Sequence, residues 1–337
     1  MTILVGDVGG TKTVLALVRW VEGVPGLDRV IRLPSGAYPS MENLVQDYLN
    51  TCGARPTHAA FAVAGPVQEG RSQITNLSWL IESEGLKRTF ALQRVTLLND
   101  LEAIAWGIPA LADEDVEVLH GGDGMGKGNA CVIAAGTGLG QAGLFWDGQR
   151  HHPFATEGGH ADFAARTDQE MALLEWLRQG FGHVSWERLV SGPGICNIYA
   201  FLRRQRALDA QEKTNKDEGF ASGLAEMEGG EDAAARIALG ANRGDCPLCT
   251  QTMELFVSLY GREAGNLALK HMALGGVYLG GGIAPKNLEL FRGPAFMQAF
   301  LAKGRMAPLM ELMPVKVILN PHTPLLGAAR YLKTQVS

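Results

Sequence analysis

Two glycine-rich turns in this chain carry residue types that suit a nucleotide phosphate. The first follows a short apolar run of buried-strand length and precedes a second β-branched run. Its glycines let backbone N–H groups approach an anion closely, because no Cβ intervenes. Asp7 offers carboxylate oxygens to a hydrated Mg²⁺ ion, and Thr11 and Thr13 offer hydroxyls. The turn predicts a metal–nucleotide site; a tight hairpin in which Asp7 caps its own turn is the alternative.

A second turn of the same design lies between residues 131 and 144. An apolar strand leads into Gly136, Thr137 and Gly138, and a second apolar strand follows. Two such hairpins indicate a weak internal repeat. We therefore predict two related half-domains that face each other across a phosphate.

The second turn also matches a dinucleotide-binding pattern, through Gly138, Gly140 and Gly143. That pattern must open a helix to bind a pyrophosphate. Here residues 144–146 have strand character and Asp147-Gly148 is a typical hairpin turn. The context argues against a dehydrogenase.

Asn99 and Asp100 directly follow a predicted buried strand at residues 95–98. Ligands of α/β sheets bind beyond the carboxyl ends of strands, so Asp100 could accept a proton from a hydroxyl that Asn99 orients. Both residue types are also favoured helix caps. Capping of a helix that begins at Leu101 is the alternative, and both roles can hold together.

A tight loop brings Glu157 and His160 together, because Gly158 and Gly159 separate them. The carboxylate can accept from a sugar hydroxyl, and the imidazole can donate or accept. A histidine packed on Phe163 is the competing interpretation. A metal site is less favoured, since helical histidine spacing and paired-cysteine spacing are lacking.

Glu187 follows a turn at residues 182–186. It either reaches a cleft or pairs with Arg188.

Composition bounds the class of protein. The chain has 337 residues, 46% of them hydrophobic and 19% charged, which allows two globular domains. A net charge of −5 argues against a general nucleic-acid or anionic-membrane surface. The sequence has neither an apolar stretch long enough to span a membrane nor a signal-peptide pattern. Five scattered cysteines fit reduced thiols in the cytosol. Cys246 and Cys249 are therefore expected to be unpaired structural thiols.

Periodicity predicts an α/β protein with mixed sheets. The first hundred residues follow the order β-β-β-α-β-α-β-α, with a helix over residues 41–52. An amphipathic helix is expected over 168–179, with Met171, Leu174 and Leu177 in the core. Residues 205–231 are polar and charged and predict a solvated surface excursion. Further helices are expected at 233–242, 250–274 and 325–336, the last of which crosses back to the first domain.

Taken together and in order, these motifs resemble the bacterial-type glucokinases of the actin, hexokinase and sugar-kinase superfamily, in the branch without zinc. The resemblance covers essentially the whole chain, from residues 6–11 through 99–100, 135–140, 157–160 and 191–194 to 280–283. It implies a two-lobed actin-like, ribonuclease H-like ATPase fold with an active site in the interlobe cleft. The expected domains are residues 1–109 with 320–337, and residues 110–319.

The resemblance implies transfer of the γ-phosphoryl group of ATP to the 6-hydroxyl of glucose, in the cytoplasm, with ATP and Mg²⁺ required. Asp100 is the implied base and Asp7 is the implied Mg²⁺ ligand, acting through water. The implied sugar-binding residues are Asn99, Asp100, Glu157, His160 and Glu187. The implied nucleotide-binding residues are Gly6, Asp7, Gly9, Gly10, Thr11, Lys12, Thr13, Gly136, Thr137, Gly138, Gly281 and Gly282.

Two departures from the family pattern affect these expectations. Lys12 stands where asparagine is common, and it either holds phosphate or faces solvent. The cysteine cluster that binds zinc in the related repressor and kinase branch is lacking, which removes the main reason to expect DNA binding. Mannose or fructose as acceptor, polyphosphate as donor, and a sugar-sensing regulator remain alternatives. A homodimer is a further expectation from the resemblance.

Overall fold

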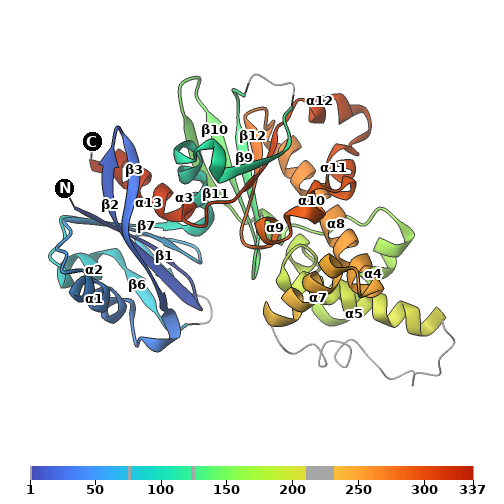
Figure 1. The fold of residues 1–337 in the computed structure, drawn as a ribbon, viewed down its shortest axis with the longest axis horizontal. Coiled ribbons are helices and arrows are strands. Elements are labelled where there is room, and N and C mark those ends of the chain that lie inside the picture. Colours follow the sequence, from blue (N-terminus) through green and yellow to red (C-terminus); the bar gives the residue numbers. More distant parts are fainter. Residues whose placement is uncertain (1, 75–76, 123–125, 210–230, 337) are drawn as a thin grey trace. The chain divides into compact units, whose positions relative to one another are not determined.

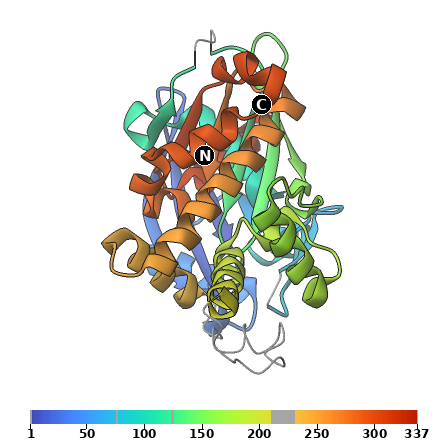
Figure 2. The same cartoon turned by 90° about the vertical axis from the view of Figure 1, so that its right-hand side faces the viewer.

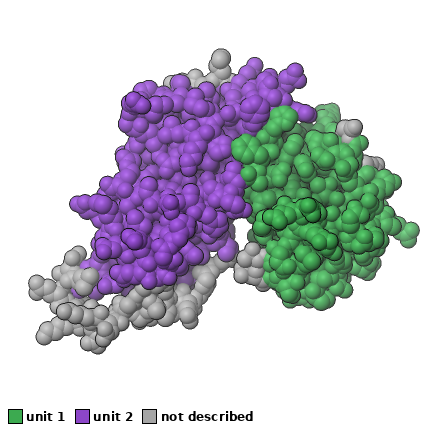
Figure 3. Space-filling view, turned by 180° about the vertical axis from the view of Figure 1, so that it is seen from behind, with its two compact units in different colours: residues 1–116, 152–155, 319–337 green, residues 117–151, 156–318 purple. Residues whose placement is uncertain are grey.

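The computed structural model describes residues 2–74, 77–122, 126–209 and 231–336. These residues form two compact units, which are coloured separately in Figure 3. Unit 1 contains residues 1–116, 152–155 and 319–337, and unit 2 contains residues 117–151 and 156–318. Most of the predicted excursion at 205–231 lies outside the described residues.

Unit 1 is built on a five-stranded mixed sheet with the strand order β3-β2-β1-β4-β7. Strands β1 and β2 form an antiparallel hairpin, and β1, β4 and β7 run parallel. The strands are β1 (Ile3–Val8), β2 (Lys12–Val21), β3 (Val24–Pro34), β4 (His58–Val63) and β7 (Arg94–Asn99). The predicted element order of the first hundred residues is confirmed, with a small additional hairpin of β5 (Arg71–Gln73) and β6 (Leu80–Glu82).

Helices cover both faces of this sheet (Figure 1). On one face lie α1 (Met41–Cys52) and α2 (Ser83–Thr89); on the other lie α3 (Asp100–Gly107) and α13 (Thr323–Val336). The predicted apolar face of α1 is confirmed, because Leu44, Val45, Tyr48 and Leu49 are all buried. Alternation along β1 decides which side chains meet which helices. Leu4 and Val8 join the α1 side, whereas Ile3 and Val5 join the α3 and α13 side.

Helices α3 and α13 pack backbone to backbone. A Cβ at Gly327 of α13 would lie 1.7 Å from the carbonyl oxygen of Ala103 in α3, and a Cβ at Gly107 would lie 2.3 Å from that of Thr323. A larger side chain at either glycine would force the helices apart. The end of the chain therefore fixes the position of the helix that begins at Asp100.

Most of a second sheet lies in unit 2, and this sheet repeats the arrangement of the sheet in unit 1. The strand order is β11-β10-β9-β12-β13-β8, in which β9 and β10 form an antiparallel hairpin and β12 lies parallel to β9. The strands are β8 (Val116–His120), β9 (Ala130–Ala135), β10 (Leu139–Trp146), β11 (His151–Thr156), β12 (Gly276–Gly280) and β13 (Val315–Ile318). In both units a later strand runs parallel to the first strand of the glycine-rich hairpin. The predicted internal repeat is thus confirmed at the level of topology, and so are the mixed sheets flanked by helices.

A long central helix, α8 (Pro247–His271), organises the helices of unit 2 (Figure 2). It packs against α5 (Gly192–Asp209), α7 (Glu231–Arg243) and α11 (Pro294–Leu301). Its Tyr260 hydroxyl accepts from Ala135 N–H and donates to Ile133 C=O, which pins the end of β9. The remaining helices are α4 (Asp168–Phe181), α9 (Ile283–Lys286), α10 (Leu288–Arg292) and α12 (Ala307–Glu311).

The prediction of which side chains of α4 are buried is partly wrong. Leu177 is buried as expected, but Met171 is 51% exposed, and Leu173 and Trp176 point into the core instead. Glu170 also faces inward, where it forms a bidentate ion pair with Arg262 of α8 at 2.5 and 2.6 Å. The buried face of α4 is therefore centred on positions that include a charged residue, which apolar periodicity cannot reveal.

The prediction for the C-x-x-C pair is also wrong. Cys246 and Cys249 form a disulfide at the start of α8, with their Cα atoms 5.2 Å apart. Cys52, Cys131 and Cys196 are free and buried. Helix geometry explains the pairing, because the N-cap residue and the third helical residue are close neighbours across the first turn. Separately, no helix in the described part of the chain combines the length and apolar character needed to cross a bilayer.

Candidate active site

The first glycine-rich turn of unit 1 connects β1 to β2 at the carboxyl end of β1. Val8 pairs with Thr13, and Gly9 N–H donates to Lys12 C=O at 3.0 Å, which closes a four-residue loop. Gly10 is half-buried and Thr11 is exposed within that loop. The predicted phosphate turn is therefore an accessible hairpin loop at a sheet edge.

A hydrogen-bond network supports this loop from behind. The Ser35 hydroxyl lies 2.9 Å from the buried Thr13 hydroxyl and donates to Gly9 C=O at 2.7 Å. Ser35 N–H also donates to Thr11 C=O at 3.1 Å. Thr13 thus has a supporting position rather than an open one. Gly6 is likewise inside, since a Cβ there would lie 2.5 Å from the Phe61 ring.

Asp7 lies on the opposite side of β1 from Thr13 and Gly6. Alternation places it with Ile3 and Val5, on the face that α3 and α13 cover. Desolvation raises the pKa of Asp7 to about 6, and the nearby Lys12 ammonium opposes that rise. A bound cation stabilises the ionised form of a half-buried carboxylate whose charge is poorly solvated. Because Mg²⁺ takes one or two protein carboxylates and completes its shell with water and phosphate oxygens, Asp7 fits that role.

Asn99 and Asp100 mark the junction of β7 and α3. The side-chain Oδ1 of Asn99 accepts from Leu101 N–H at 2.9 Å and from Glu102 N–H at 3.4 Å, so Asn99 is the N-cap of α3. Its amide nitrogen donates to Gly65 C=O at 3.3 Å. Asp100 is the first residue of the helix and is half-buried, with Leu101 N–H 3.0 Å from Oδ1. The predicted capping role of Asn99 is confirmed.

The parallel register brings these two groups to one edge of the sheet. Val8 at the end of β1 pairs with Val63 of β4, which pairs with Asn99 of β7. Two strand spacings, roughly 10 Å, thus separate the end of β1 from the end of β7. Asp7 and the start of α3 also share a face of the sheet. This edge of unit 1 therefore collects the half-buried Asp7 carboxylate, a glycine loop and a second carboxylate.

The corresponding edge of unit 2 collects the second glycine turn and the predicted adenosine glycines. Ala134 at the end of β9 pairs with Gly280 at the end of β12. Gly136 N–H donates to Gly138 C=O at 2.9 Å, and a Cβ at Gly136 would meet no atom within 4 Å. Gly281 has φ +76°, and a Cβ there would lie 2.3 Å from Ala135 C=O, so only glycine fits. The exposed residues on this edge are Thr137, Gly281 and Gly282.

The loop that carries Glu157 and His160 packs directly on this edge. A Cβ at Gly159 would lie 1.9 Å from Leu139 C=O, and a Cβ at Gly158 would lie 2.1 Å from Gln141 Oε1. The two glycines therefore let the loop contact β10. Glu157 and His160 point outward, with side chains 71% and 60% exposed and 3.9 Å between Oε2 and Nε2. The competing interpretation of a histidine packed on Phe163 is not favoured by this exposure.

Glu187 belongs to the same cluster. Its Oε2 accepts from Leu139 N–H at 2.9 Å and lies 2.6 Å from where a Gly138 Cβ would stand. The alternative pairing with Arg188 is wrong, because the Arg188 guanidinium lies over the Phe181 ring at 4.1 Å. Unit 2 thus brings three predicted elements together around Gly138 and Leu139: the second glycine turn, the 157–160 loop and Glu187.

Two residues of the candidate site were not predicted from the sequence. Lys286 of α9 has its Nζ 3.8 Å from the position of a Gly282 Cβ, so it adds a cation beside the exposed glycine pair. The i,i+4 spacing from Gly282 to Lys286 is the signal that could have revealed it. Ser35 is the other, and its role depends on β2–β3 pairing, for which the local sequence holds no signal.

A family model described as Glucokinase matches residues 4–335. A protein named Glucokinase from Trichormus variabilis is 40% identical over 334 residues, 97% of each chain. A crystal structure of glucokinase from an Antarctic psychrotroph has a TM-score of 0.82 and 32% identity, and the match covers 99% of both chains. A ROK family glucokinase from Streptomyces griseus, in complex with glucose and AMPPNP, has a TM-score of 0.64, 20% identity and coverage of 98% and 99%.

Proposed function

The chain belongs to the Glucokinase family, and from that premise we propose that it transfers the γ-phosphoryl group of ATP to the 6-hydroxyl of glucose. The products are glucose 6-phosphate and ADP. The observation that carries this conclusion is the family match over residues 4–335, together with relatives at about 40% identity along nearly the full chain. The mixed α/β units have the two-lobed actin-like fold of the sugar kinases.

We propose Asp100 as the general base. Its carboxylate begins α3 at the carboxyl end of β7, and Asn99 caps that helix from the preceding position. As the glucose 6-hydroxyl attacks the γ-phosphorus, Asp100 takes the hydroxyl proton while the bond to the ADP oxygen breaks. Because phosphoryl transfer needs little beyond positioning and charge neutralisation, one poised carboxylate suffices for the proton.

The remaining site residues are proposed to hold the substrates. Asp7 would hold Mg²⁺ through water, and the ion would neutralise phosphate charge. Gly9, Gly10, Thr11, Lys12 and Thr137 would each bind phosphate oxygens, and Lys286 would add a cation beside Gly281 and Gly282. Asn99, Glu157, His160 and Glu187 would bind sugar hydroxyls. The Streptomyces griseus glucokinase complex with glucose and AMPPNP supports this pair of substrates.

We also propose two lobes, one formed by residues 1–109 with 320–337 and the other by residues 110–319. A cytoplasmic location, a homodimer and a lack of nucleic-acid or membrane partners stay predictions from the sequence.

A coupled assay for ADP release tests the activity. ATP and Mg²⁺ are supplied with glucose, mannose, fructose, N-acetylglucosamine or no sugar. We expect strong turnover selective for glucose. Glucose binding by calorimetry without turnover on any sugar would contradict the proposal and favour a sugar sensor or another phosphate donor, for which polyphosphate is the next substrate to assay.

The exposed carboxylate of Glu157 gives a test of sugar binding. Glu157→Gln should raise KM for glucose about tenfold with little change in kcat, because a neutral amide is a weaker acceptor of sugar hydroxyls. Glu175→Gln on the exposed face of α4 is the matched control and should leave both constants unchanged. A fall in kcat at constant KM would remove Glu157 from the sugar site.

The pKa of Asp7 gives a pH test. With a pKa of about 6, the carboxylate that binds Mg²⁺ forms as the pH rises through 6. KM for Mg-ATP should therefore be about tenfold higher at pH 5 than above pH 7. Lys12→Met should move the inflection to higher pH, since Lys12 lowers the pKa of Asp7, whereas Lys12→Arg should keep it. A pH-independent KM in the wild type would exclude Asp7 from metal binding.

A further inference from the structure

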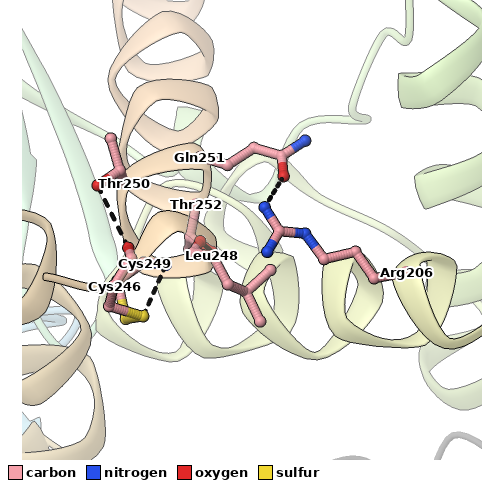
Figure 4. Close-up of a disulfide and its surroundings, with 7 residues drawn as sticks. All are labelled: Arg206, Cys246, Leu248, Cys249, Thr250, Gln251 and Thr252. Carbon is pink, nitrogen blue, oxygen red and sulfur yellow. Dashed lines mark hydrogen bonds between the residues drawn. A yellow bond between two sulfur atoms is a disulfide. The ribbon is translucent and has the colours of Figure 1, made fainter. Parts of the chain in front are cut away.

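The Cys246–Cys249 disulfide lies at the first turn of α8 (Figure 4). Cys246 is the N-cap residue and is partly exposed, whereas Cys249 is only 8% exposed. The three other cysteines are buried and unpaired. Access therefore selects one sulfur, that of Cys246, for attack.

The start of α8 stabilises negative charge on these sulfurs. Cys249 N–H lies 3.2 Å from Cys246 Sγ, so it can donate to a thiolate there. Cys249 itself lies in the first helical turn, where unpaired N–H groups and the helix dipole favour an anion. Helix N-termini are the setting in which cysteine thiolates become reactive. We propose that Cys246 and Cys249 form a reversible thiol–disulfide exchange site that takes electrons from a dithiol reductant and controls ATP affinity.

The exchange balances in two steps. A thiolate of the reductant attacks Cys246 Sγ, the bond to Cys249 Sγ breaks, and Cys249 leaves as a thiolate in the first helical turn. The second thiol of the reductant then attacks its own sulfur in the mixed disulfide and releases Cys246. The protein gains two electrons and two protons, and the reductant becomes a disulfide.

Helix α7 lies between this site and the segment that binds the glycine turn of unit 2. Gly240 of α7 faces the disulfide, since a Cβ there would lie 3.1 Å from Cys249 Sγ and 3.3 Å from Cys246 Cβ. Ala234, on the same helix, lies 3.9 Å from the position of a Gly192 Cβ at the start of α5. Gly192 N–H donates to Gly136 C=O at 2.8 Å. In the proposed control, reduction replaces the covalent bond that faces α7 by a non-bonded contact, and the adjustment of α7 passes through Gly192 to the turn at Gly136.

Intact-mass analysis tests the exchange independently of kinase activity. The native protein is equilibrated with glutathione disulfide or with dithiothreitol and is then alkylated with N-ethylmaleimide. We expect no alkylation of Cys246 and Cys249 after the oxidant, and alkylation of both after dithiothreitol. Cys246→Ser and Cys249→Ser should each abolish the paired change, whereas the matched control Cys196→Ser should keep it. Two alkylated cysteines after excess glutathione disulfide in the wild type would overturn the exchange site.

Steady-state kinetics test the connection to the turn. KM for ATP should differ two- to fivefold between the oxidised and reduced wild type, and the difference should vanish in Cys246→Ser. Identical KM values in two forms that differ by mass would overturn control of ATP affinity. Since the mass readout needs no turnover, a protein inactive in both forms would contradict the proposed kinase function alone.

Discussion

Replacement of Asp100 by alanine is expected to lower kcat by a hundredfold to ten-thousandfold, on the order of the usual contribution of a general base. Glucose should still bind with a similar Kd, because proton acceptance matters mainly in the transition state. Steady-state kinetics with ATP and glucose, and calorimetry with glucose alone, measure the two quantities.

Asp100→Asn distinguishes the loss of the base from the loss of the hydrogen bond at the start of α3. Asp100→Asn keeps an oxygen that can accept from Leu101 N–H, now 3.0 Å from Oδ1, but it cannot take a proton. The two variants should therefore be equally slow. Glu102→Gln, two residues along the same helix, should turn over at nearly the wild-type rate. If Asp100→Asn kept near wild-type turnover, Asp100 would not be the base.

The second large effect is on stability. Glu170 and Arg262 are a buried pair with side chains 4% and 9% exposed. Arg262→Met leaves Glu170 buried without its partner, which should lower the free energy of unfolding by about 3–5 kcal/mol. Urea denaturation followed by circular dichroism measures the change. Arg292→Met removes an exposed pair with Glu117 as the matched control and should cost less than about 1 kcal/mol.

The pH dependence of this pair has a definite sign. Burial alone would raise the pKa of Glu170, but hydrogen bonds from Arg262 and from Arg166 N–H outweigh it and the pKa is lowered. The pair therefore stabilises the fold above the ordinary pKa of 4.5, and its contribution is lost as the pH falls through the lower folded value. Glu170→Gln in the Arg262→Met background should recover stability at neutral pH. A double variant as unstable as Arg262→Met would mean that the loss comes from packing alone.

Structure could be predicted from the sequence where side-chain chemistry and backbone geometry point to the same local element. Glycine turns after apolar strands predicted both hairpins, and the Asn99-Asp100 pair predicted the cap of α3. Strand direction then brings the ends of β1 and β7 to one edge, which follows from the α/β pattern without further information.

The failures arise from tertiary contacts between distant segments. The inward face of α4 depends on Arg262, 92 residues away from Glu170, so apolar spacing placed Met171 on the wrong side. Glu187 accepts from the backbone of Leu139, 48 residues away, a contact that its position just after a turn could not reveal. The prediction of unpaired thiols at Cys246 and Cys249 was wrong for another reason. It relied on the reducing conditions of the cytosol, whereas the pairing depends on the geometry of a helix N-terminus.

The close packing of α13 on α3 has a consequence for biosynthesis. Residues 1–116 emerge from the ribosome about two hundred residues before residues 319–337, which complete the same unit. At ordinary elongation rates the interval is on the order of 10–40 s. During that time the sheet face lined by Ile3 and Val5 lacks α13, which covers it in the finished protein. A nascent chain must therefore keep this apolar face from aggregating until α13 has been synthesised, and a premature stop codon before α13 leaves the face permanently uncovered.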